Sequence, residues 1–266
     1  MPRYKITVEY DGRPFAGWQR QKNVITVQEV IERAVKKFCG ETITLGGAGR
    51  TDAGVHATGQ VAHIDLEKDW PAKTVRNALN FHCQPDPVAI LACEKTGPGF
   101  DSRFSATRRH YRYRIENRLS PLTFDIGLAW HVKPELDADA MNDAAQVLLG
   151  HHDFTTFRHT HCQAKSPWKT MEKISVYRRD QTVFLECSSR SFLHNQVRSM
   201  VGTLRLVGEG KWNKEDVKTA LEAKDRTACG PVAVPDGLYL TQVDYRSAEE
   251  DLASLRVYQE SLKVTA

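Results

Sequence analysis

The chain has 266 residues, 41% of them hydrophobic and 26% charged, and this length can bury a substantial core in one large domain or in two fused small ones. Its six cysteines are scattered without a C-x-x-C pair, which indicates reduced thiols rather than a disulfide scaffold. The start of the chain has no secretion signal and no apolar run could cross a bilayer, so we expect a cytoplasmic protein with no membrane partner.

The first hundred residues predict the order strand, helix, strand, strand, helix, strand. Period-two alternation indicates the strands, and apolar residues at helical spacing indicate the helices. The predicted elements are a strand at 4–10, a helix from Thr26 to Gly40, strands at 42–45 and 61–66, a helix from Pro71 to about Asn80, and a strand at 88–95. This order is that of a ferredoxin-like domain.

The second half repeats this order of elements without a repeat at the level of residues. The predicted elements are a strand at 110–117, a helix at 137–149, a hairpin of 173–179 with 182–188, helices at 192–207 and 214–224, and a strand at 238–245. We therefore predict an α+β fold of two ferredoxin-like (RRM-like) halves, 1–105 and 106–246, whose antiparallel sheets adjoin with helices on one face. A helical tail is expected over 247–266.

The stretch GAGRTDAGVHATGQ, residues 47–60, holds four glycines around Asp52 and is predicted to join the two middle strands of the first half. Glycine permits unusual backbone angles and close approach of another molecule. Asp52 is then either a turn residue that bonds its own backbone or a chemical group on display. The stretch lacks Gly-Lys-Ser/Thr and the G-x-G-x-x-G fingerprint, which disfavours binding of a nucleoside triphosphate.

Positive charge is concentrated in RFSATRRHYRYRIENR, residues 103–118, which holds six arginines and three aromatic residues. On a strand, Tyr111 and Tyr113 point to one face, and Arg112 and Arg114 to the other. One interpretation is a core-facing aromatic row with a solvated charged face. The other is a stacking surface for unpaired RNA bases, with arginines for the phosphates of a central basic RNA-binding cleft.

The stretch SFLHNQVRSMVGTLRLVG, residues 191–208, predicts a helix with a polar stripe that includes His194 and Arg198. Such a stripe is ordinarily the wet side of a helix. If it faces Asp52, however, a guanidinium there would hold the carboxylate ionised.

The stretch HHDFTTFRHTHC, residues 151–162, holds four histidines and a cysteine. No second pair of ligands follows at finger-like spacing, and the zinc deaminase signature is absent. These histidines are read as loop residues within reach of RNA, with metal binding as the lesser alternative.

Taken together, several segments resemble the tRNA pseudouridine synthase A (TruA) family. They are YDGRPFAGWQRQ (10–21), VQEVIERAV (27–35), GAGRTDAGVHATGQV (47–61), RFSATRRHYRYRI (103–115), LLGHHDFTTF (148–157), SFLHNQVRSMVGTL (191–204), AKDRT (223–227) and GLYL (237–240). The resemblance implies isomerisation of uridine to pseudouridine at positions 38, 39 and 40 in the anticodon stem-loop of tRNA. It also implies a homodimer that uses neither a metal nor an organic cofactor.

The resemblance also assigns residues. Asp52 matches the catalytic aspartate, Tyr111 the tyrosine that stacks on the target base, and Arg198 the arginine that pairs with the aspartate. Asp52 would attack the ribose C1′ or the uracil C6, and Tyr111 could help to remove the C5 proton. Weaker assignments as RNA contacts are Arg20, Arg50, His56, Arg108 and Arg109. One departure is His110, where another basic or polar residue is expected.

Two alternatives remain at this point. The first is an RNA-binding protein without catalytic activity, made of two RRM-like halves, which would give Asp52 no role. The second is a pseudouridine synthase that acts on another RNA.

Overall fold

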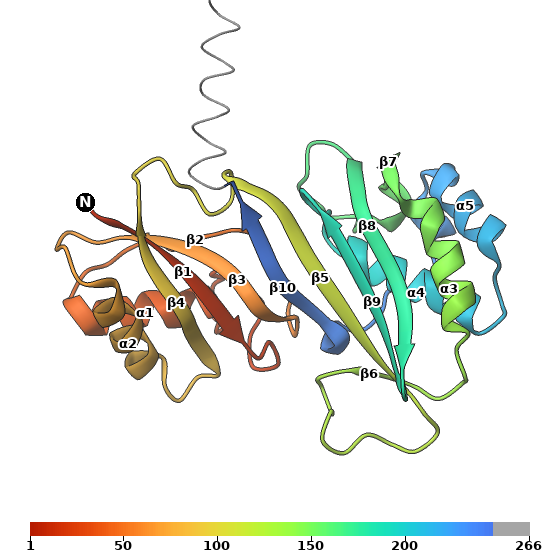
Figure 1. Ribbon diagram of the computed structural model, residues 1–266, viewed down its shortest axis with the longest axis horizontal. Coiled ribbons are helices and arrows are strands. Elements are labelled where there is room, and N and C mark those ends of the chain that lie inside the picture. Colours follow the sequence, from red (N-terminus) through yellow and green to blue (C-terminus); the bar gives the residue numbers. More distant parts are fainter. Residues whose placement is uncertain (247–266) are drawn as a thin grey trace, which may run out of the picture.

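The protein is built on one large β-sheet. The computed structural model describes residues 1–246, so the expected helical tail at 247–266 lies outside the described residues. Residues 1–246 contain a ten-stranded sheet and five α-helices, and in Figure 1 the helices lie behind the sheet in two groups. The chain is therefore a mixed α+β protein with helices on one side of its sheet.

The first half of the chain forms the left side of the sheet in Figure 1. Its elements are β1 (Arg3–Tyr10), α1 (Val27–Cys39), β2 (Gly46–Gly47), β3 (His56–Asp65), α2 (Ala72–Cys83) and β4 (Val88–Thr96). β1 pairs antiparallel with both β3 and β4, and β2 pairs antiparallel with β3. Thr26 caps α1, since its hydroxyl accepts a hydrogen bond from the Glu29 N–H at 3.3 Å, and Gly40 ends the helix with a φ of 83°.

The second half forms the right side of the sheet. Its elements are β5 (Ala106–Asn117), β6 (Trp130–Val132), α3 (Ala138–Ala145), β7 (Gly150–Asp153), β8 (Trp168–Arg179), β9 (Thr182–Ser189), α4 (Gln196–Gly208), α5 (Lys214–Ala223) and β10 (Leu238–Tyr245). β5 pairs antiparallel with β9 and β10, and β9 pairs antiparallel with β8. The complete order is β4-β1-β3-β10-β5-β9-β8-β7, with β2 beside β3 and β6 beside β5.

The two halves meet at a short parallel pairing of β3 with β10. In this seam Tyr239 lies opposite His56, and Leu240 lies opposite Ala57. The backbones approach closely beside these pairs, because a Cβ on Gly59 would lie 2.1 Å from the carbonyl oxygen of Thr241. The seam therefore requires a residue without a side chain at position 59.

Each half has its own hydrophobic core, but three segments near the seam contribute across it. β10 places Leu240 and Val243 in the first core and Leu238 in the second. Val55 comes from the first half and is buried in the second core. Tyr111 packs against both cores. The stretch around Asp52 is thus fixed by hydrophobic burial on both sides of the seam.

Several predicted boundaries were wrong, and three of them lie near the seam or the loop with Asp52. The strand expected at 42–45 is instead β2 at Gly46 and Gly47, and β3 begins at His56 rather than Val61. β2 and the start of β3 lie in the glycine-rich stretch and pair through their backbones, so the side-chain pattern does not show where these strands begin. α4 begins at Gln196 rather than Phe192, because Asn195 has a left-handed φ of 63°.

Two expectations about composition can be compared with the structure. All six cysteines are free thiols, as their spacing predicts. Over residues 1–246, the structure contains no helix that is long and apolar enough to cross a membrane.

We predict that Gly59→Ala destabilises the fold, because its methyl group would collide with main-chain atoms of β10 across the seam. The expected loss in free energy of unfolding is about 2 kcal/mol, measured by urea denaturation. Gly97→Ala is the matched control, since a Cβ there would have no heavy atom within 4 Å. Equal effects of the two variants would show that the close approach at the seam has no energetic importance.

Candidate active site

Asp52 lies on the loop 48–55, which connects β2 to β3 and is held by the segment that follows β1. The Trp18 N–H donates to the carbonyl oxygen of Thr51 at 3.1 Å. The Thr51 hydroxyl is 2.7 Å from the phenol oxygen of Tyr10 in a buried hydrogen bond. Burial raises the pKa of Tyr10, so this phenol stays protonated. The residue directly before Asp52 is therefore fixed by both its backbone and its side chain.

Two glycines shape this loop by their backbone conformation. Gly54 has a φ of 77°, which few residues with a side chain adopt. Gly17 has a φ of 98°, and a Cβ there would lie 2.5 Å from the carbonyl oxygen of Thr51. Gly46 and Gly47, by contrast, belong to β2. The conformation that displays Asp52 thus depends on Gly54 and on one glycine outside the predicted motif.

Arg198 reaches Asp52 from α4, across the seam. Its Nη1 is 3.3 Å from Oδ2 of Asp52 and also donates to Oδ1 of Asn195 at 3.1 Å. Its Nε donates to the carbonyl oxygen of Ala233 at 2.7 Å. The side chain is only 16% exposed, so the guanidinium is fixed by its neighbours. The predicted ion pair between Asp52 and Arg198 is present.

His194 is a second partner of Asp52, for which no role is expected from the sequence. Its Nε2 lies 3.2 Å from Oδ1 of Asp52, and its side chain is 41% exposed. Its spacing of four residues from Arg198 was the available signal, although the two do not share a helix face because α4 begins after Asn195. Each oxygen of the carboxylate therefore has one side-chain nitrogen beside it.

Tyr111 lies on β5 beside this carboxylate. The predicted alternation along β5 is present, since Tyr113 is buried and Arg112 is exposed. The Tyr111 ring packs edge to face against Phe192, with ring centres 5.1 Å apart. Burial raises the pKa of Tyr111, and the negative charge of Asp52 raises it further. The phenol is therefore neutral at physiological pH.

Arg109 is buried and clamps three loops together. Its guanidinium donates to the carbonyl oxygens of Ala48 (2.7 Å), Arg103 (2.7 Å) and Arg190 (2.5 Å). Burial lowers its pKa, yet a guanidinium remains charged at neutral pH. Ala48 belongs to the Asp52 loop and Arg190 lies just before the segment with His194. This predicted RNA contact thus has its donors engaged inside the protein.

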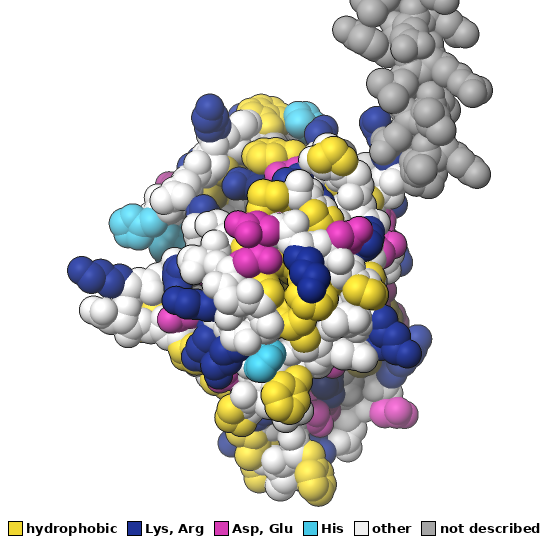
Figure 2. Space-filling model, turned by 90° about the vertical axis from the view of Figure 1, so that its left-hand side faces the viewer, with side chains coloured by type: hydrophobic (Ala, Val, Ile, Leu, Met, Phe, Trp, Pro, Cys, Tyr) yellow, Lys and Arg dark blue, Asp and Glu magenta, His cyan; other side chains and the backbone are white. Residues whose placement is uncertain are grey.

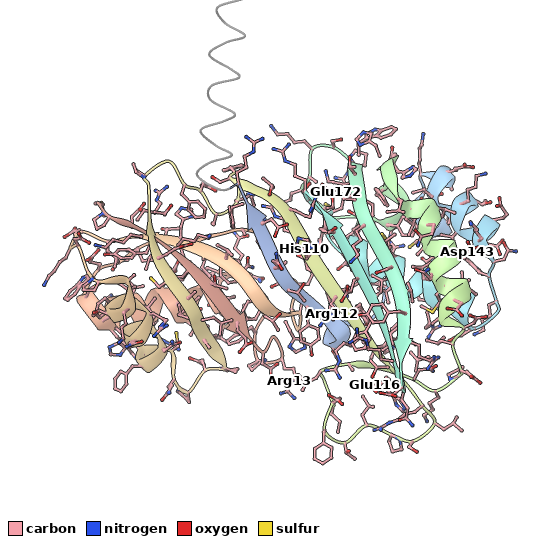
Figure 3. All side chains as sticks on the ribbon, in the orientation of Figure 1. Arg13, His110, Arg112, Glu116, Asp143 and Glu172 are labelled. Atoms are coloured by element: carbon pink, nitrogen blue, oxygen red, sulfur yellow. The ribbon has the colours of Figure 1, made fainter. Side chains whose placement is uncertain are left out.

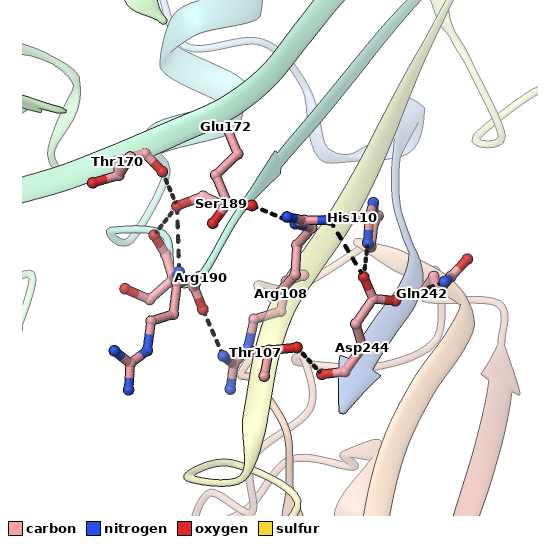
Figure 4. Close-up of polar contacts among 11 residues, drawn as sticks. Thr107, Arg108, His110, Thr170, Glu172, Ser189, Arg190, Gln242 and Asp244 are labelled. Atoms are coloured by element: carbon pink, nitrogen blue, oxygen red, sulfur yellow. Dashed lines mark hydrogen bonds and ion pairs between the residues drawn. The ribbon is translucent and has the colours of Figure 1, made fainter. Parts of the chain in front are cut away.

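Arg108 points to the opposite face of β5, away from Asp52. There it belongs to a row of ion pairs on the open side of the sheet, from which Figure 3 shows His110, Arg112 and Glu172 projecting. The pairs are Arg108 with Glu172, His110 with Asp244 at 2.8 Å, and Arg112 with Glu186 at 2.7 Å. Figure 4 shows the contacts that join Arg108, His110 and Asp244. His110, the departure noted in the sequence, is thus part of this row.

His56 is buried near the seam and connects two loops through hydrogen bonds. Its Nδ1 accepts a hydrogen bond from the Gly12 N–H at 3.0 Å, and its Nε2 lies 3.1 Å from the carbonyl oxygen of Gly127. Its ring stacks on Tyr239 with centres 4.7 Å apart. Burial lowers the pKa of His56, which favours the neutral ring with its proton on Nε2. The 3.3 Å approach of Asp11 to Nδ1 is therefore not an ion pair at neutral pH.

Arg20 and Arg50 have exposed side chains. Arg50 follows Gly49 in the Asp52 loop and donates to Oε1 of Gln163 at 3.2 Å. Arg20 pairs with the buried carboxylate of Glu32 at 3.1 Å. Figure 2 shows Lys and Arg side chains on both edges of one face of the molecule, with Asp and Glu among them. Side chains of both charges are thus interspersed on this face.

The histidine-rich segment is a loop only in part, since His151 and His152 belong to β7, which pairs through its backbone with β8; the loop that follows lies against the site. The rings of His159 and His194 are 4.5 Å apart, and those of His159 and His161 are 5.5 Å apart. Nevertheless, within residues 1–246, no three His, Cys, Asp or Glu side chains are grouped so that they could hold a metal ion. The His159 ring thus lies next to His194, which contacts Asp52, and adds a further polar group near this carboxylate.

The sequence matches a known protein family over most of its length. The family described as tRNA pseudouridine synthase matches residues 6–105 and 144–246, which include Asp52, His194 and Arg198. Tyr111 lies between the two matched segments. The protein is accordingly a pseudouridine synthase, an isomerase.

Individual relatives narrow this class. The chain is 60% identical over 245 residues to the tRNA pseudouridine synthase A of Parvibaculum lavamentivorans, covering 92% of this chain and all of the relative. The same-named proteins of Maricaulis maris (60%) and Brucella ovis (61%) each match over 92% of this chain and 98% of their own length. The chain belongs to the tRNA pseudouridine synthase A family.

One solved structure is also similar, at a lower level. It is the crystal structure of a Cbf5-Nop10-Gar1 complex, with 11% identity, a TM-score of 0.32, and coverage of 76% of this chain and 54% of that one. A TM-score this low carries no argument about this protein.

We predict that Arg109→Ala destabilises the protein by about 3 kcal/mol, because it leaves buried carbonyl oxygens of three loops without a donor. Urea denaturation measures this change. Arg108→Ala is the control, since it removes a part-exposed ion pair on the other face and should cost less than about 1 kcal/mol. An Arg109→Ala variant as stable as wild type, but weak in tRNA binding, would instead support a direct RNA contact.

Proposed function

We propose that this protein converts uridine to pseudouridine at positions 38, 39 and 40 in the anticodon stem-loop of tRNA. The observation that carries the proposal is Asp52, displayed at the seam between Arg198 and His194, with Tyr111 beside it. The names of the relatives support tRNA as the substrate. The family resemblance supports the stem-loop and its three positions.

The proposed fold is a duplication of two ferredoxin-like halves, 1–105 and 106–246. In the first half the four strands lie in the order β4-β1-β3-β2, and in the second half β10-β5-β9-β8 follow the same order of first to fourth strand. Each half has one α-helix between its first two long strands; before its last strand the first half has α2, and the second half has α4 followed by α5. These parallels support a common plan, in which the seam forms the centre of a basic RNA-binding cleft.

In the proposed mechanism the target base first leaves the stack of the RNA. Flipping a base costs a few kcal/mol, and stacking on the flat ring of Tyr111 would offset part of this cost. Arginine contacts with phosphates would offset more of it, and exposed Arg50 on the Asp52 loop is well placed for one. The base would then lie beside the carboxylate of Asp52.

Asp52 acts as the nucleophile, at either the ribose C1′ or the uracil C6. The C1′–N1 bond breaks, the uracil turns, and a C1′–C5 bond forms. C5 loses its proton and N1 gains one, so the product is an isomer and no redox partner is consumed. Arg198 stabilises the ionised carboxylate from its fixed position. Because the Tyr111 phenol is neutral, it can accept the C5 proton only if it gives up its hydroxyl proton at the same time. Stacking on the base is therefore its primary proposed role.

We also propose a homodimer in the cytoplasm. The family resemblance supports both properties. It also implies that the isomerisation uses neither a metal nor an organic cofactor.

The proposed function predicts that Asp52→Asn abolishes isomerisation while the fold is retained. Tritium release from C5-tritiated uridine in tRNA should fall at least about a thousandfold, because the amide is not a nucleophile. Asp180→Asn is the control, since it is an exposed turn residue with a φ of 52°, a conformation that asparagine tolerates.

The target positions are tested in cells that lack the protein. Pseudouridine at positions 38–40 should disappear, and it should return with the wild type or Asp180→Asn but not with Asp52→Asn. Intact modification at these positions, with loss in a different RNA, would assign the activity to that RNA. Unchanged tritium release by Asp52→Asn would contradict the catalytic assignment.

We further predict that Arg198→Ala lowers kcat about a hundredfold, because a fixed charge beside the reacting carboxylate is lost. The free energy of unfolding should fall by only about 2 kcal/mol, the contribution of the hydrogen bonds to Ala233 and Asn195. Single-turnover rates and urea denaturation measure the two effects. The control is Arg205→Ala, because Arg205 lies on the same helix but pairs with Glu209. A loss of activity that follows the unfolded fraction would make Arg198 a structural residue.

A further inference from the structure

The two oxygens of Asp52 contact two side chains that differ in how firmly they are held. Arg198 contacts Oδ2 and is also anchored to the carbonyl oxygen of Ala233 and to Asn195. His194 contacts Oδ1 with Nε2, at 3.2 Å, and its side chain is 41% exposed against 16% for Arg198. Rotation of the imidazole would therefore break few buried contacts, whereas removal of the guanidinium would break several.

The backbone of His194 is fixed although its ring is exposed. Its carbonyl oxygen accepts a hydrogen bond from the His159 N–H at 3.0 Å, and its own N–H donates to Sγ of Cys162 at 3.4 Å. The His159 ring lies against it on the side of the 158–162 segment. The imidazole can thus turn about its side-chain bonds while its attachment point stays in place.

An attacking carboxylate oxygen must present a free electron pair to carbon. Oδ2 faces the fixed guanidinium, so it stays paired throughout the reaction. Oδ1 faces only the exposed imidazole among the two side chains that contact Asp52, and it becomes free when that ring moves. The difference in freedom therefore distinguishes the two oxygens chemically.

We propose that His194 is a further catalytic residue, which covers Oδ1 of Asp52 in the free enzyme and is displaced by the incoming uridine to release this oxygen for attack. The inference rests on the proposed function, since it takes Asp52 to be the nucleophile. The electron pair that Oδ1 donates to C1′ or C6 returns to it when pseudouridine forms. His194 is neither oxidised nor consumed, and its proton state is the same before and after the turnover.

The charge on His194 sets how strongly it covers the oxygen. An imidazolium forms an ion pair with the carboxylate, whereas a neutral imidazole forms at most a weaker hydrogen bond. The charged and titratable groups around it are Asp52 from the catalytic loop, Arg198 from α4, and His159, His161 and Cys162 from the histidine-rich segment. Burial lowers the pKa of His159, and the neighbouring imidazoles of His194 and His161 lower it further, which favours a neutral His159.

The test is the pH dependence of the single-turnover rate at saturating tRNA, from pH 5.5 to pH 8. A protonated imidazole covers Oδ1 more strongly than a neutral one, so the wild-type rate should fall about tenfold from pH 8 to pH 5.5. His194→Gln carries no charge at any of these pH values, so its rates at pH 5.5 and pH 8 should agree within about twofold. A melting temperature close to that of the wild type would show that this variant is folded.

Two further histidine variants complete the experiment. His151→Gln removes an exposed histidine that stacks on Trp168 outside the site, and it should keep the tenfold fall. His159→Gln should also keep it, because His159 does not contact the carboxylate. A tenfold fall in His194→Gln, or its loss in His159→Gln instead, would overturn the inference. Absence of pseudouridine with the wild type at every pH would overturn both this inference and the proposed function.

Discussion

The ion pair between Asp52 and Arg198 joins two side chains that are 146 residues apart in the chain. Neither half of the protein can form it alone, because the aspartate belongs to a loop of the first half and the arginine to a helix of the second. Its geometry depends on the seam, where β3 meets β10 over only two residue pairs. Burial of Val55 in the second core and the clamp of Arg109 on Ala48 hold the loop to this position. Catalytic geometry and cohesion of the two halves therefore rely on the same contacts.

A single basic segment of the sequence serves three separate purposes in the structure. Arg109 lies inside the protein and bonds carbonyl oxygens of three loops. Arg108 and Arg112 pair with glutamates on the open side of the sheet. Tyr111, between them in sequence, faces the carboxylate side. The alternation of a strand divides neighbouring residues between two faces, so local charge density in sequence does not become local charge density on the surface.

Much of the fold could be predicted from sequence because most elements are long and strongly patterned. The helix after Thr26 and the alternation of β5 are examples, since capping and periodicity are local properties. The short strand β2 was misplaced because its two glycines carry no pattern and pair only through their backbone. The start of α4 was misplaced because the left-handed conformation of Asn195 is fixed by tertiary contacts.

The site was predictable to a similar extent, and for related reasons. Asp52 and Arg198 could be paired because the family resemblance linked two motifs that no local pattern connects. The role of Arg109 could not be predicted, because its partners are backbone carbonyl oxygens. Every residue has such an oxygen, so the sequence gives no sign of which ones Arg109 contacts. His194 was visible only as a neighbour of Arg198, and its contact with Asp52 depends on how the chain turns before α4.

The position of β10 has a consequence for the synthesis of the protein. β10 is the last strand of the described chain, yet it lies at the middle of the sheet between β3 and β5. The first half can collapse around its own core while the ribosome is still translating the second, but the two sheets cannot join before residues 238–245 have emerged. A nascent chain therefore carries the aspartate loop for most of its translation without the arginine and seam that complete it. The proposed active site is complete only once β10 has inserted.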